Sequence, residues 1–307
     1  MKFNMIKIGF GLLAGVITTE SIHACACGCS VFDVGTSSML PTGSGMVAYL
    51  EYDYQNQNDN RSGTSSAPSS DNDDKKIATQ SYTAGLQSMF NRRWGAQIEV
   101  PYLLRTFDTD ENAASLHWSG LGDIRLRGIY TGFSEDMSSG LTFGVKLPTG
   151  GFKHTESLGD IDRDTQIGSG SMDLLLGGFM RGSFSAEPRW KWFTQAQVDA
   201  PVITQDHYRP GPEVDAAAGV YYEGLSLGPA RISPILQVIG SVRGRDSGSA
   251  SSHEDTGYER VLVSPGIEVH LAPVKIYLDA ELPVYEHVNG NQLVAPVLWK
   301  MGVSYMF

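Results

Sequence analysis

The last fifteen residues of the chain constrain its fold more than any other segment. From Leu293 to Phe307, every second position is apolar or aromatic, and the positions between them are mostly small or polar. This alternation puts the two sets of side chains on opposite faces of a β-strand. A strand that is apolar along one face and ends in an aromatic residue is typical of the closing strand of a membrane-spanning β-barrel, in which every backbone N–H and C=O is paired between strands.

The same period of two recurs along the chain from Gly45 onward. In the segment from Trp94 to Thr106, for example, Ile98 and Val100 alternate with Gln97 and Glu99. A tilted strand needs about 9–11 residues to cross a membrane. We therefore expect about twelve strands, over residues 46–54, 77–90, 94–106, 120–132, 140–147, 172–182, 190–202, 214–225, 231–242, 261–271, 274–284 and 293–307.

The connections between these segments are alternately long and short. Polar stretches at 55–76, 108–119, 148–171 and 243–259 read as loops, whereas 91–93 and 272–273 are tight turns. Single-chain outer-membrane barrels have an even strand number, short periplasmic turns and long extracellular loops. A soluble β-sandwich would give similar strands without this asymmetry. The sequence thus predicts an all-β fold, a transmembrane antiparallel up-and-down β-barrel with both termini periplasmic.

The first residues predict export from the cytoplasm. Lys2 and Lys7 precede the apolar run from Ile8 to Ile17, and Ala24 is a small residue suited to cleavage. The run is too short to span a bilayer as a helix, which needs about 20 residues, so we expect residues 1–24 to be a signal peptide. Residues 25–44 then form a Cys-rich periplasmic segment, which could plug the lumen, and residues 45–307 form the barrel.

The charge and hydropathy narrow the range of partners. The formal net charge is -11, and such an acidic chain argues against a nucleic-acid partner, because phosphate binding needs a basic surface. The mean hydropathy of -0.17 fits a membrane barrel, since only alternate residues meet lipid. We expect the partners to be outer-membrane lipid, a small-molecule solute and the barrel-assembly machinery, with Tyr305 and Phe307 as its recognition signal.

The polar face of the predicted strands gives a set of candidate lumen residues with charges of both signs. Close to equal numbers of acids and bases favour mutual pairing, because an unpaired charge in a narrow barrel is costly. One interpretation is a salt-bridged wall that only stabilises the barrel, and the other is a narrow channel that orients a polar or zwitterionic solute. The candidates are Glu51, Asp53, Glu99, Arg105, Asp123, Arg125, Arg127, Lys146, Asp173, Arg181, Lys191, Asp215, Glu268, Lys275, Asp279, Glu281 and Lys300.

All three cysteines of the chain lie together, at Cys25, Cys27 and Cys29, directly after the predicted cleavage site. Thiolates at this spacing could bind a soft metal such as Cu(I) or Zn(II). Two of them could instead form a disulfide in the oxidising periplasm. A third alternative is lipidation of Cys25, because residues 22–25 loosely resemble a lipoprotein cleavage site.

One short motif raises the question of an enzyme. His117-Trp118-Ser119 has the His-x-Ser spacing of outer membrane phospholipase A, which also has twelve strands. The asparagine that follows the serine in that family is replaced by Gly120, and no third member of a catalytic group is evident. We place the motif in a polar loop and do not predict an enzyme.

Two further motifs resemble a transport family. The stretch from Leu121 to Arg127 (LGDIRLR), followed by Gly144 to Gly150 (GVKLPTG), is similar to the phenol-degradation meta-pathway family of outer-membrane proteins. The resemblance implies a barrel that acts as a channel for hydrophobic or aromatic compounds. The Cys-rich start is not part of that pattern and favours a variant linked to a metal or redox chemistry.

Together these features predict an outer-membrane channel or transporter for small solutes. The alternative is a surface receptor or adhesin whose long loops do the work while the occluded barrel serves as an anchor.

Overall fold

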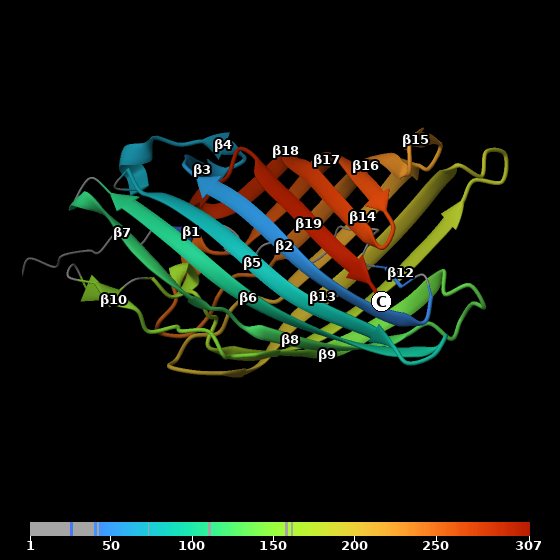
Figure 1. Cartoon of the computed structure of the whole chain (residues 1–307). Helices are drawn as coiled ribbons and strands as arrows, with labels where there is room; N and C mark the ends of the chain where they lie inside the picture. Colours follow the sequence, from blue (N-terminus) through green and yellow to red (C-terminus); the bar gives the residue numbers. More distant parts are fainter. Residues whose placement is uncertain are drawn as a thin grey trace, which may run out of the picture.

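The computed structural model describes residues 25–26, 40–41, 43–72, 74–109, 112–156, 159–160 and 162–307. In this part of the chain, twelve antiparallel strands form a closed barrel (Figure 1). The strands are β2 (Gly45–Gln57), β5 (Lys76–Met89), β6 (Trp94–Thr109), β8 (Ile124–Tyr130), β9 (Ser139–Leu147), β12 (Ser171–Ser183), β13 (Trp190–Thr204), β14 (Glu213–Tyr222), β16 (Ala230–Arg243), β17 (Tyr258–Leu271), β18 (Val274–Val294) and β19 (Leu298–Met306).

Neighbours in sequence are neighbours in the wall, and β19 closes it against β2. Lys300 of β19 lies opposite Asp279 of β18 on one side and opposite Asp53 of β2 on the other. Shorter elements extend this wall or lie at its ends: β1 (Cys25–Ala26), β3 (Asp59–Gly63), β4 (Ser65–Ser66), β7 (Asn112–Leu121), β10 (Thr155–Glu156), β11 (Gly159–Asp160), β15 (Leu225–Leu227), and the 3-10 turns η2 (Ser69–Asn72), η3 (Arg163–Thr165) and η4 (His253–Asp255).

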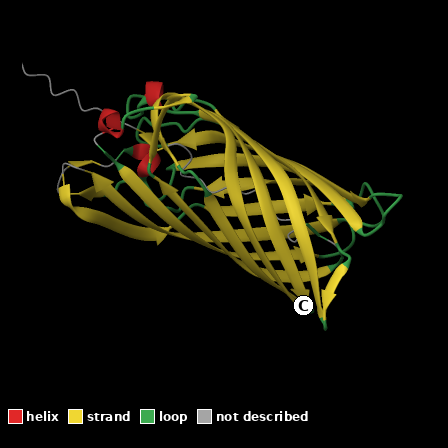
Figure 2. Cartoon of the chain, turned by 90° about the horizontal axis from the view of Figure 1, so that it is seen from above, coloured by secondary structure: helices red, strands yellow, loops and turns green. Residues whose placement is uncertain are grey.

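The two ends of the barrel differ. One end, here called the loop end, carries the long connections 148–170, 205–212 and 244–257. The 3-10 turns of the described residues gather at this end (red in Figure 2). The other, the turn end, carries the short connections 90–93 and 272–273 and the end of β19. The predicted fold class and the alternation of long and short connections are confirmed.

Several predicted boundaries were wrong at the loop end. Residues 55–76, expected to be a loop, contain the end of β2 together with β3 and β4. Residues 108–119, expected to be a loop, belong to the end of β6 and to β7, which pairs with β6. Strand β18 runs on to Val294 instead of ending at Val284, so that β19 begins at Leu298 and not at Leu293. Beyond the lipid both faces of a strand meet water, and the alternation that marks a spanning strand is no longer needed there.

The outward face of the barrel is apolar. Along β19, Trp299, Met301, Val303 and Tyr305 are exposed, whereas Lys300, Gly302 and Ser304 are buried. Aromatic pairs gather on the outside near the turn end, where Trp94 packs against Tyr130 and Trp190 against Tyr222 in tilted arrangements, with ring centroids 4.7 and 5.1 Å apart. An apolar band bordered by aromatic side chains suits the boundary between hydrocarbon and headgroups.

The described helical turns include none that is long and apolar enough to cross a membrane.

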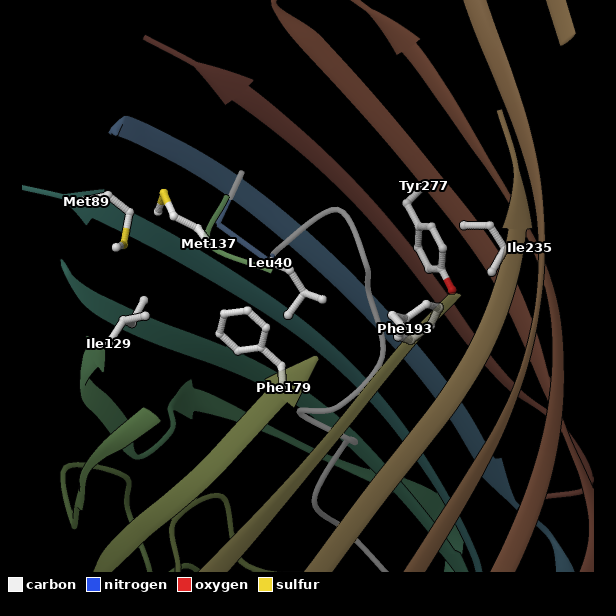
Figure 3. Packing of buried hydrophobic residues seen from close by; sticks show 8 residues of the cluster. All are labelled: Leu40, Met89, Ile129, Met137, Phe179, Phe193, Ile235 and Tyr277. Atoms are coloured by element: carbon white, nitrogen blue, oxygen red, sulfur yellow. The ribbon is translucent and has the colours of Figure 1, made fainter. Parts of the chain in front are cut away.

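The inside of the barrel is polar near its middle and apolar toward the turn end. Figure 3 shows the apolar cluster, in which side chains from strands on different sides of the barrel reach into its interior around Leu40. The members are Leu40, Met89, Ile129, Met137, Phe179, Phe193, Ile235 and Tyr277. We expected polar side chains along the whole lumen, so this apolar section was missed.

Candidate functional site: the charged interior

The charged residues proposed to line the lumen lie on the barrel wall, none of them exposed to solvent outside. Nine are buried, and the other eight are half-buried. The buried group comprises Asp53, Arg105, Asp123, Arg127, Asp173, Asp215, Asp279, Glu281 and Lys300; the half-buried group comprises Glu51, Glu99, Arg125, Lys146, Arg181, Lys191, Glu268 and Lys275.

Lys300 occupies the centre of the most acidic part of the wall. Its Nζ lies 3.5 Å from Glu51 Oε1 and 3.5 Å from Asp53 Oδ1. Asp279 faces it across the β18–β19 ladder, and Glu281 lies two residues further along β18. One ammonium group on β19 thus lies among four carboxylates, two on β2 and two on β18, and we call these five residues the Lys300 cluster.

Asp279 is held by three hydrogen bonds. Its Oδ2 accepts from Gln237 Nε2 at 2.9 Å, from Tyr277 Oη at 2.8 Å and from Ser264 Oγ. In contrast, no described residue donates to Glu281 Oε1, which is also buried.

The opposite wall contains two smaller ion pairs. Lys146 Nζ contacts Asp173 and lies 3.2 Å from Asp199 Oδ2. Arg127 pairs with Glu99, which also accepts a hydrogen bond of 2.7 Å from Tyr49. These contacts support the interpretation that charges of both signs in the lumen stabilise the wall by pairing.

Charges nearer the turn end also have partners. Lys275 Nζ lies 3.8 Å from Glu268 Oε1, and Lys191 Nζ lies 3.7 Å from Glu223 Oε2. Near the loop end, Asp215 accepts a hydrogen bond from Ser241. Arg181 Nη2 donates to the carbonyl of Pro41 at 3.0 Å, so it contacts the N-terminal segment directly.

Two of the predicted lumen residues hold the loop 148–170 in place. Asp123 accepts hydrogen bonds from Gly150 N (2.9 Å), Ser169 N (2.8 Å) and Ser169 Oγ (2.6 Å). Arg105 donates to the carbonyls of Thr165 and Gln166, the latter at 3.0 Å. Both side chains therefore bind the base of this loop inside the barrel.

The two motifs that resemble the transport family meet at this point. Thr149 Oγ1 donates to the Gly122 carbonyl at 2.8 Å and accepts from Ile124 N at 2.9 Å. With the bond from Asp123 to Gly150, the end of GVKLPTG is thereby attached to the start of LGDIRLR. Residues of the two motifs therefore attach the start of the loop 148–170 to the segment before β8.

Loop residues that the sequence did not single out also line the interior. The Arg163 guanidinium lies 4.7 Å from the ring centroid of Phe152 and 4.8 Å from that of Tyr208. Tyr208 donates a 2.5 Å hydrogen bond to Asp246, and burial raises the pKa of Tyr208 well above its ordinary value. Polar loop composition gave no signal that these side chains fold inward.

Two cavities lie one beyond the other inside the barrel. The larger, of about 120 Å³, lies toward the loop end and is lined by charges of both signs, among them Asp53, Arg105, Arg125, Lys146 and Arg163. The smaller, of about 100 Å³, lies toward the turn end and is lined by Leu40, Phe179, Gln195, Arg127 and Lys300. Glu51 borders both cavities, Asp53 borders the larger one and Lys300 borders the smaller one, so this part of the Lys300 cluster lies where the cavities adjoin.

The structure describes only part of the predicted cysteine cluster. The backbone of Cys25 pairs with Gln292 of β18, near the loop end, whereas Cys27 and Cys29 lie outside the described residues. The described residues contain no group of three or more His, Cys, Asp or Glu side chains that could hold a metal ion. The predicted signal peptide, residues 1–24, also lies outside the described residues.

The His-x-Ser motif is in strand β7, not in a loop as we expected. His117 Nδ1 lies 3.1 Å from Thr106 Oγ1, and Ser119 Oγ lies 3.0 Å from Tyr102 Oη. Each of the two side chains is thus engaged with a different residue of β6, an arrangement that does not favour their joint use in nucleophilic catalysis.

Comparisons with solved structures support the fold. An outer membrane channel from Pseudomonas putida F1 superposes with a TM-score of 0.67 at 13% identity, covering 90% of this chain and 100% of the channel. The β domain of the Bordetella autotransporter BrkA gives a TM-score of 0.54 at 14% identity, with 86% and 100% covered. No protein-family model and no curated protein matches the chain.

Proposed function

We propose that this protein is an outer-membrane channel for small solutes and not an enzyme. The observation that carries the proposal is the pair of polar cavities that lie one beyond the other inside a closed barrel with an apolar outer face. Their sizes suit a narrow passage and exclude a wide aqueous pore of the porin type. The barrel from Pseudomonas putida F1, which superposes with a TM-score of 0.67, is itself described as an outer membrane channel.

We place the turn end in the periplasm and the loop end outside the cell, as is usual for single-chain barrels. The C-terminal end of β19 is then periplasmic. In this orientation the backbone of Cys25 lies near the outer end and Leu40 near the periplasmic end. Recognition of Tyr305 and Phe307 by the assembly machinery stays a prediction; both side chains are exposed on the outside of the barrel.

The N-terminal segment acts in this proposal as a plug. Leu40 belongs to the apolar cluster at the turn end, and the Pro41 carbonyl accepts a hydrogen bond from Arg181. Both residues also border the smaller cavity. Removal of residues 25–41 should therefore increase the single-channel conductance at least about twofold, because conductance follows the open cross-section.

Planar-bilayer recording on the refolded full chain tests the channel proposal. We expect discrete conductance steps well below those of a sixteen-stranded porin recorded in the same salt. Mock-refolded detergent without protein is the control. If the barrel is shown to be inserted in the membrane and carries no current, even after removal of residues 25–41, the proposal is contradicted.

The apolar cluster at the turn end gives weight to one alternative. If the cluster around Leu40 closes the lumen permanently, the barrel is an anchor, and the long loops act as a surface receptor or adhesin. Recording on the full chain separates the two functions, since a barrel that serves only as an anchor should carry no current.

Two finer features belong to the same proposal. The attachment of GVKLPTG to LGDIRLR supports a solute class like that of the phenol-degradation family, namely hydrophobic or aromatic compounds, which the apolar turn end would accommodate. A link to soft metal or redox chemistry rests on Cys25, Cys27 and Cys29 alone. Metal analysis of the reduced protein against the triple Cys→Ser variant tests that link, and equal metal content in both would refute it.

A further inference from the structure

Arg105 is a buried cation whose direct partners in the described part of the chain are all neutral. It is 2% exposed and borders the larger cavity. Its guanidinium donates to Thr79 Oγ1 at 3.2 Å and to the carbonyls of Thr165 and Gln166. No described carboxylate forms an ion pair with Arg105, whereas Lys146, which borders the same cavity, contacts two carboxylates.

The guanidinium also keeps hydrogen-bond donors on the cavity side. A guanidinium carries five N–H donors. The Nε hydrogen goes to Thr79, and the two hydrogens of Nη1 go to the loop carbonyls. Nη2 has no acceptor among the described residues, and it is not one of the unpartnered atoms that the protein encloses. Because Arg105 borders the larger cavity, we place the two N–H groups of Nη2 toward that open space.

Two hydroxyl groups lie beside Arg105 on the same wall. Ser81 and Thr83 of β5 are buried, border the larger cavity and make no side-chain hydrogen bond to another described residue. In the ladder of β5 with β6, Ser81 lies opposite Leu103, one inward-facing pair away from Arg105, and Thr83 lies opposite Pro101 one pair further on. The wall next to the guanidinium thus offers hydroxyl donors on one strand and apolar side chains on the other.

This arrangement fits the carboxylate of a small organic acid. A guanidinium binds a carboxylate through parallel N–H···O bonds, and hydroxyl groups add further donors. Leu103 and Pro101 offer apolar contact for the hydrocarbon part of the acid. Glu51 and Asp53 border the same cavity from the neighbouring strand β2 and repel an anion with more than one charge. A monocarboxylate therefore suits the site better than a phosphate.

Acids that border the cavity have partners of their own. Lys300 Nζ lies 3.5 Å from Glu51 and from Asp53. Asp123 accepts hydrogen bonds from the loop 148–170. These contacts leave the Nη2 side of the guanidinium to an incoming anion.

We propose that Arg105 binds the carboxylate of a small monocarboxylic acid in the larger cavity, with Ser81 and Thr83 as additional hydrogen-bond donors. The cavity volume of about 120 Å³ is several times the roughly 10–15 Å³ that one water molecule requires, so an acid of a few carbon atoms fits. The binding site stands on the wall residues, whereas passage of the acid across the membrane rests on the proposed channel function.

Thermal unfolding of the refolded full chain in detergent at neutral pH tests the site, with sodium propionate as the probe and sodium chloride at equal ionic strength as the reference. A ligand that binds the folded state raises the melting temperature. We expect propionate to stabilise the wild-type barrel and its half-maximal concentration to rise at least about tenfold in Arg105→Gln, a loss of about 1.4 kcal/mol. Arg92→Gln is the matched control, because it removes the same charge from an exposed position in a short turn.

Ser81→Ala keeps the contacts between Arg105 and the loop, so it tests the site even if Arg105→Gln does not fold. We expect its half-maximal concentration to rise at least about threefold, because one hydrogen bond to the carboxylate is lost. Wild-type stabilisation by propionate no greater than by chloride would overturn the site. So would an unchanged half-maximal concentration in Arg105→Gln, or in Ser81→Ala where Arg105→Gln does not fold. Equal stabilisation by sodium phosphate would overturn the choice of a carboxylate.

Bi-ionic reversal potentials between sodium propionate and sodium chloride test the consequence separately. The permeability ratio of propionate to chloride should fall at least about twofold in Ser81→Ala, and an unchanged ratio would show that the site does not select solutes. A barrel that carries no current but binds propionate keeps the site and loses the channel function. A barrel that conducts but is not stabilised by propionate keeps the channel and loses the site.

Discussion

At the residue scale, the charged lumen residues have two different tasks that the sequence could not separate. Asp123 and Lys300 both read as polar positions on spanning strands. In the structure, Asp123 accepts hydrogen bonds from backbone N–H groups of the loop 148–170. Lys300 instead pairs with a carboxylate of the neighbouring strand β2. The alternation of apolar and polar residues predicts which face of a strand a side chain occupies. The partner of that side chain depends on how a distant loop folds back, which the residues around it do not determine.

Asp123→Asn should loosen the loop 148–170. The amide keeps one acceptor oxygen, but its NH2 group cannot accept the hydrogen bonds from Gly150 or Ser169 that the other carboxylate oxygen accepts. We expect a loss of about 1–3 kcal/mol in the free energy of unfolding, measured by urea titration in lipid vesicles. Asp71→Asn, at an exposed position in η2, should leave that free energy unchanged; equal losses in both variants would contradict the role of Asp123.

At the element scale, the spanning strands were predicted from sequence and the ends were not. Lipid requires an apolar residue at every second position, so the sequences of strands such as β5 and β19 alternate and predict these strands directly. Strand β7 and the outer part of β18 lie beyond that requirement, and their polar sequences read as loops. The inward position of the loop 148–170 and the apolar cluster at the turn end depend on packing across the barrel, which no single segment records.

The base of the loop 148–170 depends on close backbone contact at Gly168. A Cβ there would lie 2.7 Å from Gly150 Cα and would also collide with the Gly150 carbonyl. Gly168→Ala should therefore displace the loop and raise the conductance of the channel, as measured in planar bilayers.

Gly151→Ala provides the control for that substitution, since a Cβ at Gly151 would have no heavy atom within 4 Å. An unchanged conductance in Gly168→Ala, or the same increase in Gly151→Ala, would show that the loop does not narrow the lumen.

A surface ion pair connects two loops at the loop end. Lys153 Nζ lies 2.7 Å from Asp206 Oδ2, and this hydrogen bond holds the pKa of Asp206 below its ordinary value of 3.8. Because the folded-state pKa is lowered, the contact is fully present above the ordinary pKa and is lost as the pH falls through the lowered one. NMR titration of the Asp206 carboxyl should show this shift, and Lys153→Met should raise the pKa toward its ordinary value; an unchanged pKa in that variant would contradict the contact.

At the scale of the whole molecule, the account depends on one separation of surfaces. Outward side chains such as Trp299, Met301 and Val303 meet hydrocarbon, and the inward residues between them meet an enclosed polar interior. That separation is what the alternation of the last fifteen residues predicted. In the proposed channel, the narrow cavities and the loop 148–170 would decide what can pass.

Spin labels placed in turn at residues 298–305 of the barrel in lipid vesicles test this separation most directly. Collisions with oxygen, which is enriched in hydrocarbon, should be high at 299, 301, 303 and 305 and low at 298, 300, 302 and 304. Collisions with a water-soluble nickel complex should be low at the outward positions. If labels at both sets of positions collided equally with the nickel complex, β19 would not span a membrane, and the proposed channel would have no basis.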